Sequence, residues 1–102
     1  MEIAVFGSPQ FALGFKLAGV KRTYEVEDDD PALQDKLLGL LGDDSIGVLI
    51  VSDIDIKGLP KATKHLLADN VRPVVIPVGK EDEGDIRERI KRAVGIDLYA
   101  RK

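Results

Sequence analysis

A run in the middle of the chain, from Ile46 to Val51, reads IGVLIV and contains no polar side chain. A strand with one face in water alternates apolar and polar residues, whereas a strand buried on both faces is apolar throughout. Burial on both faces requires helices above and below the sheet, which is the arrangement of parallel α/β domains. The run therefore predicts the central strand of a parallel sheet.

Three other short stretches are predicted to complete this sheet. They are Glu2–Phe6, which ends at Gly7, then Thr23–Val26 and Arg72–Pro77. The second stretch is short enough for a sheet edge. The third contains two prolines, which lack the N–H that a strand ladder requires, so an edge position is expected for it as well.

Helical signals lie between these strands. Ser8 is expected to cap a helix that has Pro9 in its first turn, runs to about Ala18 and stops before Gly19. A second helix is expected after the acidic turn Glu27–Asp30, with Pro31 in its first position. Gly42 is expected to end this helix. Its apolar face consists of Leu33, Leu37, Leu38 and Leu41.

Two more helices are predicted in the second half of the chain. One lies within Ile54–Asp69 and starts late, because Gly58 and Pro60 interrupt its beginning. The other spans Asp85–Val94 and is followed by Gly95 and a tail over residues 96–102.

The alternation of strands and helices predicts an α/β fold, a small Rossmann-like domain of the flavodoxin or receiver type with a four-stranded parallel sheet and a C-terminal helix. A chain of 102 residues supports one core. We expect residues 1–77 to form the sheet domain. Residues 78–102 are expected to form a loop, the C-terminal helix and its tail, either within the same domain or as a mobile appendage.

Composition excludes several functions. The net charge is −3, so the chain lacks the excess positive charge that favours binding to nucleic acid or an anionic membrane. The absence of cysteine excludes disulfides and thiol chemistry. No stretch approaches the roughly 20 consecutive apolar residues that span a bilayer. A cytoplasmic protein without membrane insertion is expected.

Ligands of open parallel sheets bind at the carboxyl ends of the strands, so the loops there are the candidate sites. The turn Gly7–Ser8 has one glycine and no dinucleotide fingerprint. Asp53 follows the central strand, where receiver domains carry a phosphorylated aspartate, but no acidic pair follows the first strand to hold Mg²⁺. Gly79–Lys80 fails the Walker A pattern, and the single histidine, His65, is expected on the surface. No catalytic, cofactor or metal site is predicted.

The helix at Asp85–Val94 combines a narrow apolar stripe with a basic surface in an acidic chain. The stripe is Ile86, Ile90 and Val94, and the basic residues are Arg87, Arg89, Lys91 and Arg92. Two interpretations remain open. The helix either packs on the sheet as a terminal element or docks on a partner helix through its stripe and arginines.

Gly14 raises a different question, because glycine inside a helix costs about 1 kcal/mol relative to alanine. Gly14 and Ala18 are four residues apart and form a small-residue stripe beside Phe15. We expect the missing side chain to let this helix approach a neighbouring backbone closely. Gly14 is thus predicted to serve packing and not catalysis.

Three segments together resemble the F subunit of the archaeal A-type and bacterial V-type ATP synthases. They are GFKLAGV at residues 14–20, IGVLIV at 46–51 and DIRERIKRAVGIDL at 85–98. The resemblance implies a central-stalk rotor protein without its own nucleotide site or cofactor. It implies binding to the D subunit of the stalk, which is a coiled coil, and contact of the C-terminal helix with the catalytic A and B subunits.

On this hypothesis the protein is not itself an enzyme and is a monomer when isolated. It lies at the membrane periphery, within a complex that couples ATP synthesis or hydrolysis to proton or sodium transport. The partner contacts are expected at Ile86, Arg89, Ile90 and Arg92, and the packing signature is Gly14, Phe15, Ala18 and Gly19. A receiver-like signalling module and a small-molecule-binding α/β domain are the alternatives.

Overall fold

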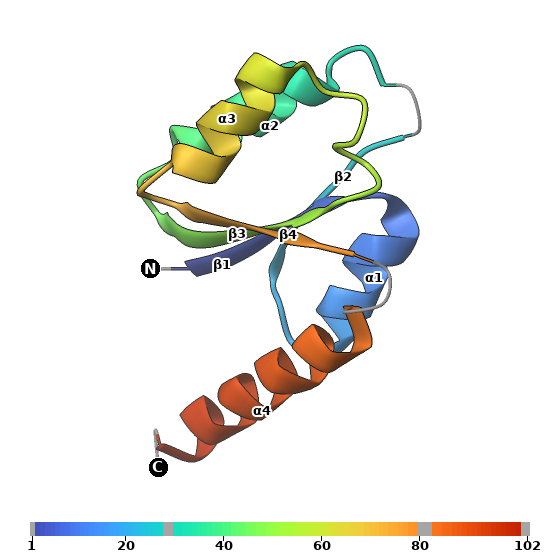
Figure 1. Ribbon diagram of the computed structural model, residues 1–102. Coiled ribbons are helices and arrows are strands. Elements are labelled where there is room, and N and C mark those ends of the chain that lie inside the picture. The colour runs from blue at the N-terminus through green and yellow to red at the C-terminus, as the bar shows by residue number, and fades with distance from the viewer. Residues whose placement is uncertain (1, 28–29, 80–82, 101–102) are drawn as a thin grey trace.

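The structure is a computed structural model that describes residues 2–27, 30–79 and 83–100, with the backbone alone for residues 83 and 94–100. Strands and helices alternate along this part of the chain (Figure 1). They are β1 (Glu2–Gly7), α1 (Pro9–Leu17), β2 (Arg22–Glu25), α2 (Leu33–Leu41), β3 (Ile46–Ser52), α3 (Lys61–Asp69), β4 (Val74–Val78) and α4 (Glu83–Ala100).

The strands form one parallel sheet in the order β2-β1-β3-β4. The apolar run that becomes β3 lies between β1 and β4, as the sequence predicts, and both expected edge strands are at edges. Across the sheet, Val5 of β1 pairs with Thr23 on one side and Ile50 on the other. The fold class predicted from the alternation is confirmed.

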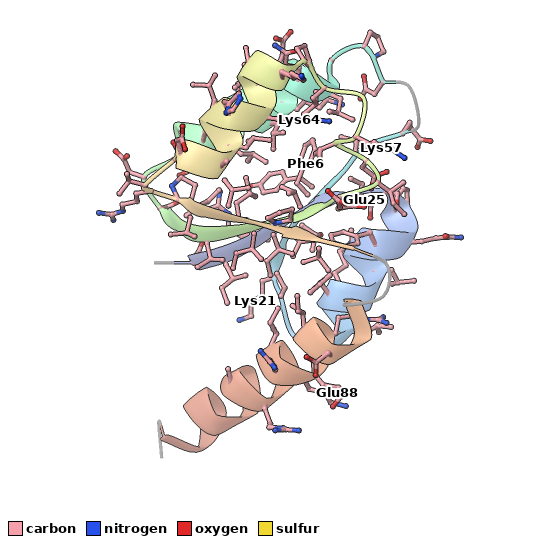
Figure 2. All side chains as sticks on the ribbon, viewed as in Figure 1. Phe6, Lys21, Glu25, Lys57, Lys64 and Glu88 are labelled. Atoms are coloured by element: carbon pink, nitrogen blue, oxygen red, sulfur yellow. The ribbon has the colours of Figure 1, made fainter. Side chains whose placement is uncertain are left out.

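Each face of the sheet carries two helices, α2 and α3 on one face and α1 and α4 on the other (Figure 1). Side chains alternate between the faces along β1, so Phe6 packs with the α2–α3 layer (Figure 2) and Val5 with the α1–α4 layer. The first core cluster includes Leu37, Leu49, Val51 and Leu67. The second is formed by Val5, Phe11, Phe15, Ala18, Val20, Ile50, Val78 and Ile90.

Helix α1 begins and ends as its sequence predicts. The hydroxyl of Ser8 accepts the N–H of Phe11 at the start. At the end, Gly19 has a φ of 113°, a left-handed conformation that favours glycine. The N–H groups of Gly19 and Val20 then donate to the carbonyls of Lys16 and Phe15, which is the hydrogen-bond pair of a Schellman motif.

Two helix boundaries differ from the predictions. Helix α2 begins at Leu33, whereas Pro31 lies in a turn in which the carboxylate of Asp30 accepts the N–H of Ala32 at 2.9 Å. Helix α4 continues through Gly95 to Ala100. An isolated glycine costs a helix only about 1 kcal/mol, and here the chain does not turn into the left-handed conformation that ends α1.

Arg22 ties the edge strand β2 to the amino ends of β1 and β3. Its guanidinium donates to Glu2 at 2.9 Å, to Asp43 at 2.8 Å and to the hydroxyl of Tyr24 at 2.7 Å. Hydrogen bonds from Ser45 and the ion pair with Arg22 lower the pKa of Asp43 from 3.8 to about 2. The folded state therefore favours the ionised form of Asp43.

The Asp43→Asn variant tests this network. Because the pKa of Asp43 is lower in the folded state, its stabilising contribution is complete above about pH 4 and is lost as the pH falls toward 2. We expect Asp43→Asn to lower the melting temperature at pH 7, with the difference from the native protein shrinking below pH 4. Thermal unfolding followed by circular dichroism across this range measures it.

Asp44→Asn is the matched control, because Asp44 is an exposed neighbour of the same charge. Equal effects of the two substitutions at pH 7 would contradict a specific role for the Arg22 network.

Candidate functional site

The carboxyl ends of β1 and β3 meet where the strand order reverses, which is the ligand site of most open α/β sheets. Here the carboxylate of Asp55 accepts the backbone N–H of Ser8 at 2.9 Å. A Cβ atom placed on Gly7 would lie 3.1 Å from the same carboxylate oxygen. The protein's own anion thus fills the position at the start of α1 where a phosphate binds in related architectures.

A cavity of about 570 Å³ lies beside this position and carries the side chains of Glu27, Asp30 and Asp55. Asp30 pairs with Lys36 at 2.8 Å, and this pairing lowers the pKa of the Asp30 carboxyl, so it is ionised at neutral pH. The lining is therefore unfavourable for phosphate, because carboxylates repel anions.

The other candidate residues at this end of the sheet are loop or surface positions. Asp53 is exposed and donates its backbone N–H to Val78 at 3.0 Å, so it is a loop residue as predicted. Within the described ranges no group of three or more histidine, aspartate or glutamate side chains could hold a metal ion. His65 is exposed on α3. Lys80 and most of the acidic loop before α4 lie outside the described residues.

The four residues predicted to contact a partner lie on different sides of α4. Ile90 is 8% exposed and joins the core cluster of Phe15 and Val5, and Ile86 packs against it. Arg89 and Arg92 are exposed to solvent. Arg89 pairs with Asp85 at 3.3 Å across one helical turn. In this arrangement Ile86 and Ile90 attach α4 to the domain, and the two arginines lie in solvent.

The α1 signature is a packing element. Phe15 is fully buried, with its ring centroid 5.0 Å from that of Phe11. Ala18 is 7% exposed. A Cβ atom on Gly14 would lie 2.9 Å from Cδ of Arg87, so the glycine makes room for an α4 side chain. The close approach predicted at Gly14 exists, but its partner is this side chain and not a backbone.

Three long-range contacts are not predicted by the sequence: those of Arg22, Asp55 and Arg87. Each joins residues far apart in the chain, as with Ser8 and Asp55, which are separated by 47 positions. No local pattern signals such a pair. The nearest signal for the contact between Arg87 and Gly14 was indirect: one predicted helix contains a glycine, and another contains several arginines.

The described helices include none that is both long enough and apolar enough to cross a membrane. The fold and the site together define a small Rossmann-like domain that fills its own switch point and presents a C-terminal helix with exposed arginines.

The chain belongs to the ATP synthase (F/14-kDa) subunit family, whose model matches residues 3–94. It is therefore an F subunit of an A-type or V-type ATP synthase, and the resemblance seen in the three sequence segments is confirmed.

Individual relatives agree with this assignment. The chain is 38% identical to the F subunit of the A-type ATP synthase from Methanocorpusculum labreanum, over 97% of this chain and 99% of the relative. It is 42% identical to the F subunit of the A-type ATP synthase from Methanospirillum hungatei, with the same coverage. The crystal structure of the V-type ATP synthase F subunit from Archaeoglobus fulgidus matches with a TM-score of 0.65 and 33% identity, over 76% of this chain and 96% of that one.

The Gly14→Leu substitution tests the packing of α1 against α4. Four added carbon atoms must displace the Arg87 side chain, and overpacking of this kind costs about 1–3 kcal/mol. We expect a lower free energy of unfolding in urea, partly restored when Arg87→Ala removes the obstructing side chain. An unchanged stability of Gly14→Leu would refute this account of the glycine.

Proposed function

We propose that this chain is a non-catalytic rotor component of the central stalk, which binds the coiled-coil D subunit and helps to couple ATP synthesis or hydrolysis to proton or sodium transport. The observation that carries the proposal is the division of α4 into an apolar side, which holds it on the domain, and a basic side in solvent. This division leaves Arg92 in solvent and Arg89 in only an exposed pair with Asp85, so both can meet a partner while the helix stays attached.

The closed switch point supports a role without catalysis. Asp55 fills the position at the start of α1, and the lining of the neighbouring cavity includes the carboxylates of Glu27, Asp30 and Asp55. A nucleotide would have to displace one anion and approach others. In the proposed function ATP is made or hydrolysed in other subunits, and this chain transmits torque.

The exposed arginines suit a coiled coil because such helices carry charged residues, often glutamate, beside their apolar seam. Arg89 and Arg92 are the proposed contacts from α4, and the helix is also proposed to reach the catalytic A and B subunits. The proposal places the chain at the cytoplasmic periphery of the membrane, bound within the complex, and as a monomer when isolated.

The Arg89→Glu/Arg92→Glu double variant tests the proposed contact. Reversal of two charges turns attraction into repulsion at the interface. We expect it to weaken binding to the D subunit of the same organism by about tenfold, equivalent to roughly 1.4 kcal/mol. Isothermal titration calorimetry on the purified proteins measures the affinity.

Lys57→Glu/Lys61→Glu is the matched control, since it makes the same change in net charge on the opposite side of the sheet. The native protein's failure to bind the D subunit would remove the main support for the proposal. Equal losses in both double variants would indicate nonspecific attraction.

We further propose that the sheet domain folds without residues 85–102, which makes this segment an appendage; the expected boundary at residue 78 is too early, because Val78 ends β4 and is 2% exposed in the core. A chain ending at Gly84 loses the burial of Ile90, which contributes about 1.5–3 kcal/mol. We expect this shortened chain to unfold cooperatively at a lower urea concentration. A noncooperative transition, or loss of the near-ultraviolet circular dichroism signal of Tyr24, would instead assign α4 to the core.

A further inference from the structure

A groove of about 440 Å³ runs between the outer sides of α1 and α4. We refer to it as the α1–α4 groove, and its lining consists of Gly14, Leu17, Ala18, Gly84, Arg87, Glu88 and Lys91. The α1 residues are spaced three and four apart, as are those of α4, so each helix contributes one continuous wall. This surface is separate from the side of α4 on which Arg89 lies.

The α1 rim of the groove is apolar. Leu17 is 76% exposed and Leu13, one turn earlier, is 54% exposed. The phenylalanines of the same helix, Phe11 and Phe15, are buried on its other side. Two leucines one turn apart on an exposed helix face form a ridge that a second helix can cover, as in ridge-and-groove packing.

The α4 wall is cationic. Arg87 and Lys91 are one turn apart and take part in none of the ion pairs found among the described residues. The Nε atom of Arg87 is buried and has no hydrogen-bond acceptor in the described part of the chain. A half-buried cation without an acceptor is destabilising, and a carboxylate brought into the groove would relieve this.

Among the described side chains that line the groove, Glu88 is the only carboxylate, and it lies on α4 (Figure 2). The described lining thus carries two cations and one carboxylate, a net positive charge in a chain whose net charge is −3. Charge and shape thus favour an occupant with acidic side chains beside an apolar stripe. A basic helix or a purely apolar ligand would leave Arg87 without an acceptor.

We propose that the α1–α4 groove docks one helix of the coiled-coil stalk partner. Apolar side chains of that helix cover Leu13 and Leu17, and a carboxylate of the same helix pairs with Arg87 and Lys91. The inference rests on the proposed function, because it assumes that this partner binds. It extends the contact from the outer side of α4 to α1, and so gives the leucine ridge a role.

The experiment compares single variants of the full chain in binding to the D subunit by isothermal titration calorimetry. Leu17→Glu should weaken binding by about tenfold or more, because it places a charge on a covered apolar contact. Lys91→Glu should weaken binding several-fold and reduce its dependence on salt. Leu66→Glu and Lys61→Glu are the matched controls, on the exposed side of α3, and should bind as the native protein does.

Folding is checked separately, since Leu17 is exposed and its substitution should leave the melting temperature unchanged. If Leu17→Glu melts lower, the milder Leu17→Gln replaces it. A charge reversal on the partner provides a second, more specific test. A lysine introduced at an acidic position of the D subunit that restores the affinity of Lys91→Glu would assign the contact.

The possible failures are distinguishable. If the native chain does not bind the D subunit, the proposed function fails and the docking inference fails with it. If the native chain binds and Arg89→Glu/Arg92→Glu weakens binding, but Leu17→Glu and Lys91→Glu bind normally, the groove inference is overturned and the proposed function stands.

Discussion

The burial of β3 on both faces is the constraint on which the rest of the structure depends. A parallel strand between two others cannot be joined to them by hairpins, so each connection must cross a face of the sheet. These crossings place α2 and α3 on one side and α1 on the other. The final helix, α4, then completes the second layer beside α1, and that neighbourhood creates both the Gly14 contact and the groove.

The position of α4 is decided by apolar burial and not by its charges. Burial of Ile90 contributes about 1.5–3 kcal/mol, whereas an exposed pair such as Arg89 with Asp85 contributes about 0–1 kcal/mol. The helix is therefore anchored by two isoleucines near its amino end and runs away from the sheet toward its carboxyl end (Figure 1). Arg89 and Arg92 lie in solvent and are not needed for this attachment.

The switch point illustrates how a widespread architecture is adapted to a role in an assembly. A fold of this type hosts many functions, and the function resides in the residues placed on it. In this chain the loop after β3 returns a carboxylate, Asp55, to the start of α1. The same feature that would receive a ligand's phosphate therefore stabilises the junction of two loops.

The sequence by itself determined the elements, because their causes are local. The apolar run of β3, the cap at Ser8 and the left-handed turn at Gly19 each depend on a few neighbouring residues. The boundaries of α2 and α4 were less well predicted. A proline such as Pro31 suits a turn as well as the first position of a helix, and an isolated glycine such as Gly95 costs a helix only about 1 kcal/mol. The resemblance to the F subunits of rotary ATP synthases was also present in short segments.

The tertiary structure alone decided which distant residues meet. Arg22 gathers Glu2, Asp43 and Tyr24, and Arg87 lies across Gly14, 73 positions away in the chain by their residue numbers. It also decided that Ile86 and Ile90 of α4 face the core while Arg89 and Arg92 face solvent. The physical reason is that side-chain contacts between elements depend on the register and packing of whole layers, whereas the periodicity of a sequence specifies only the face of each element.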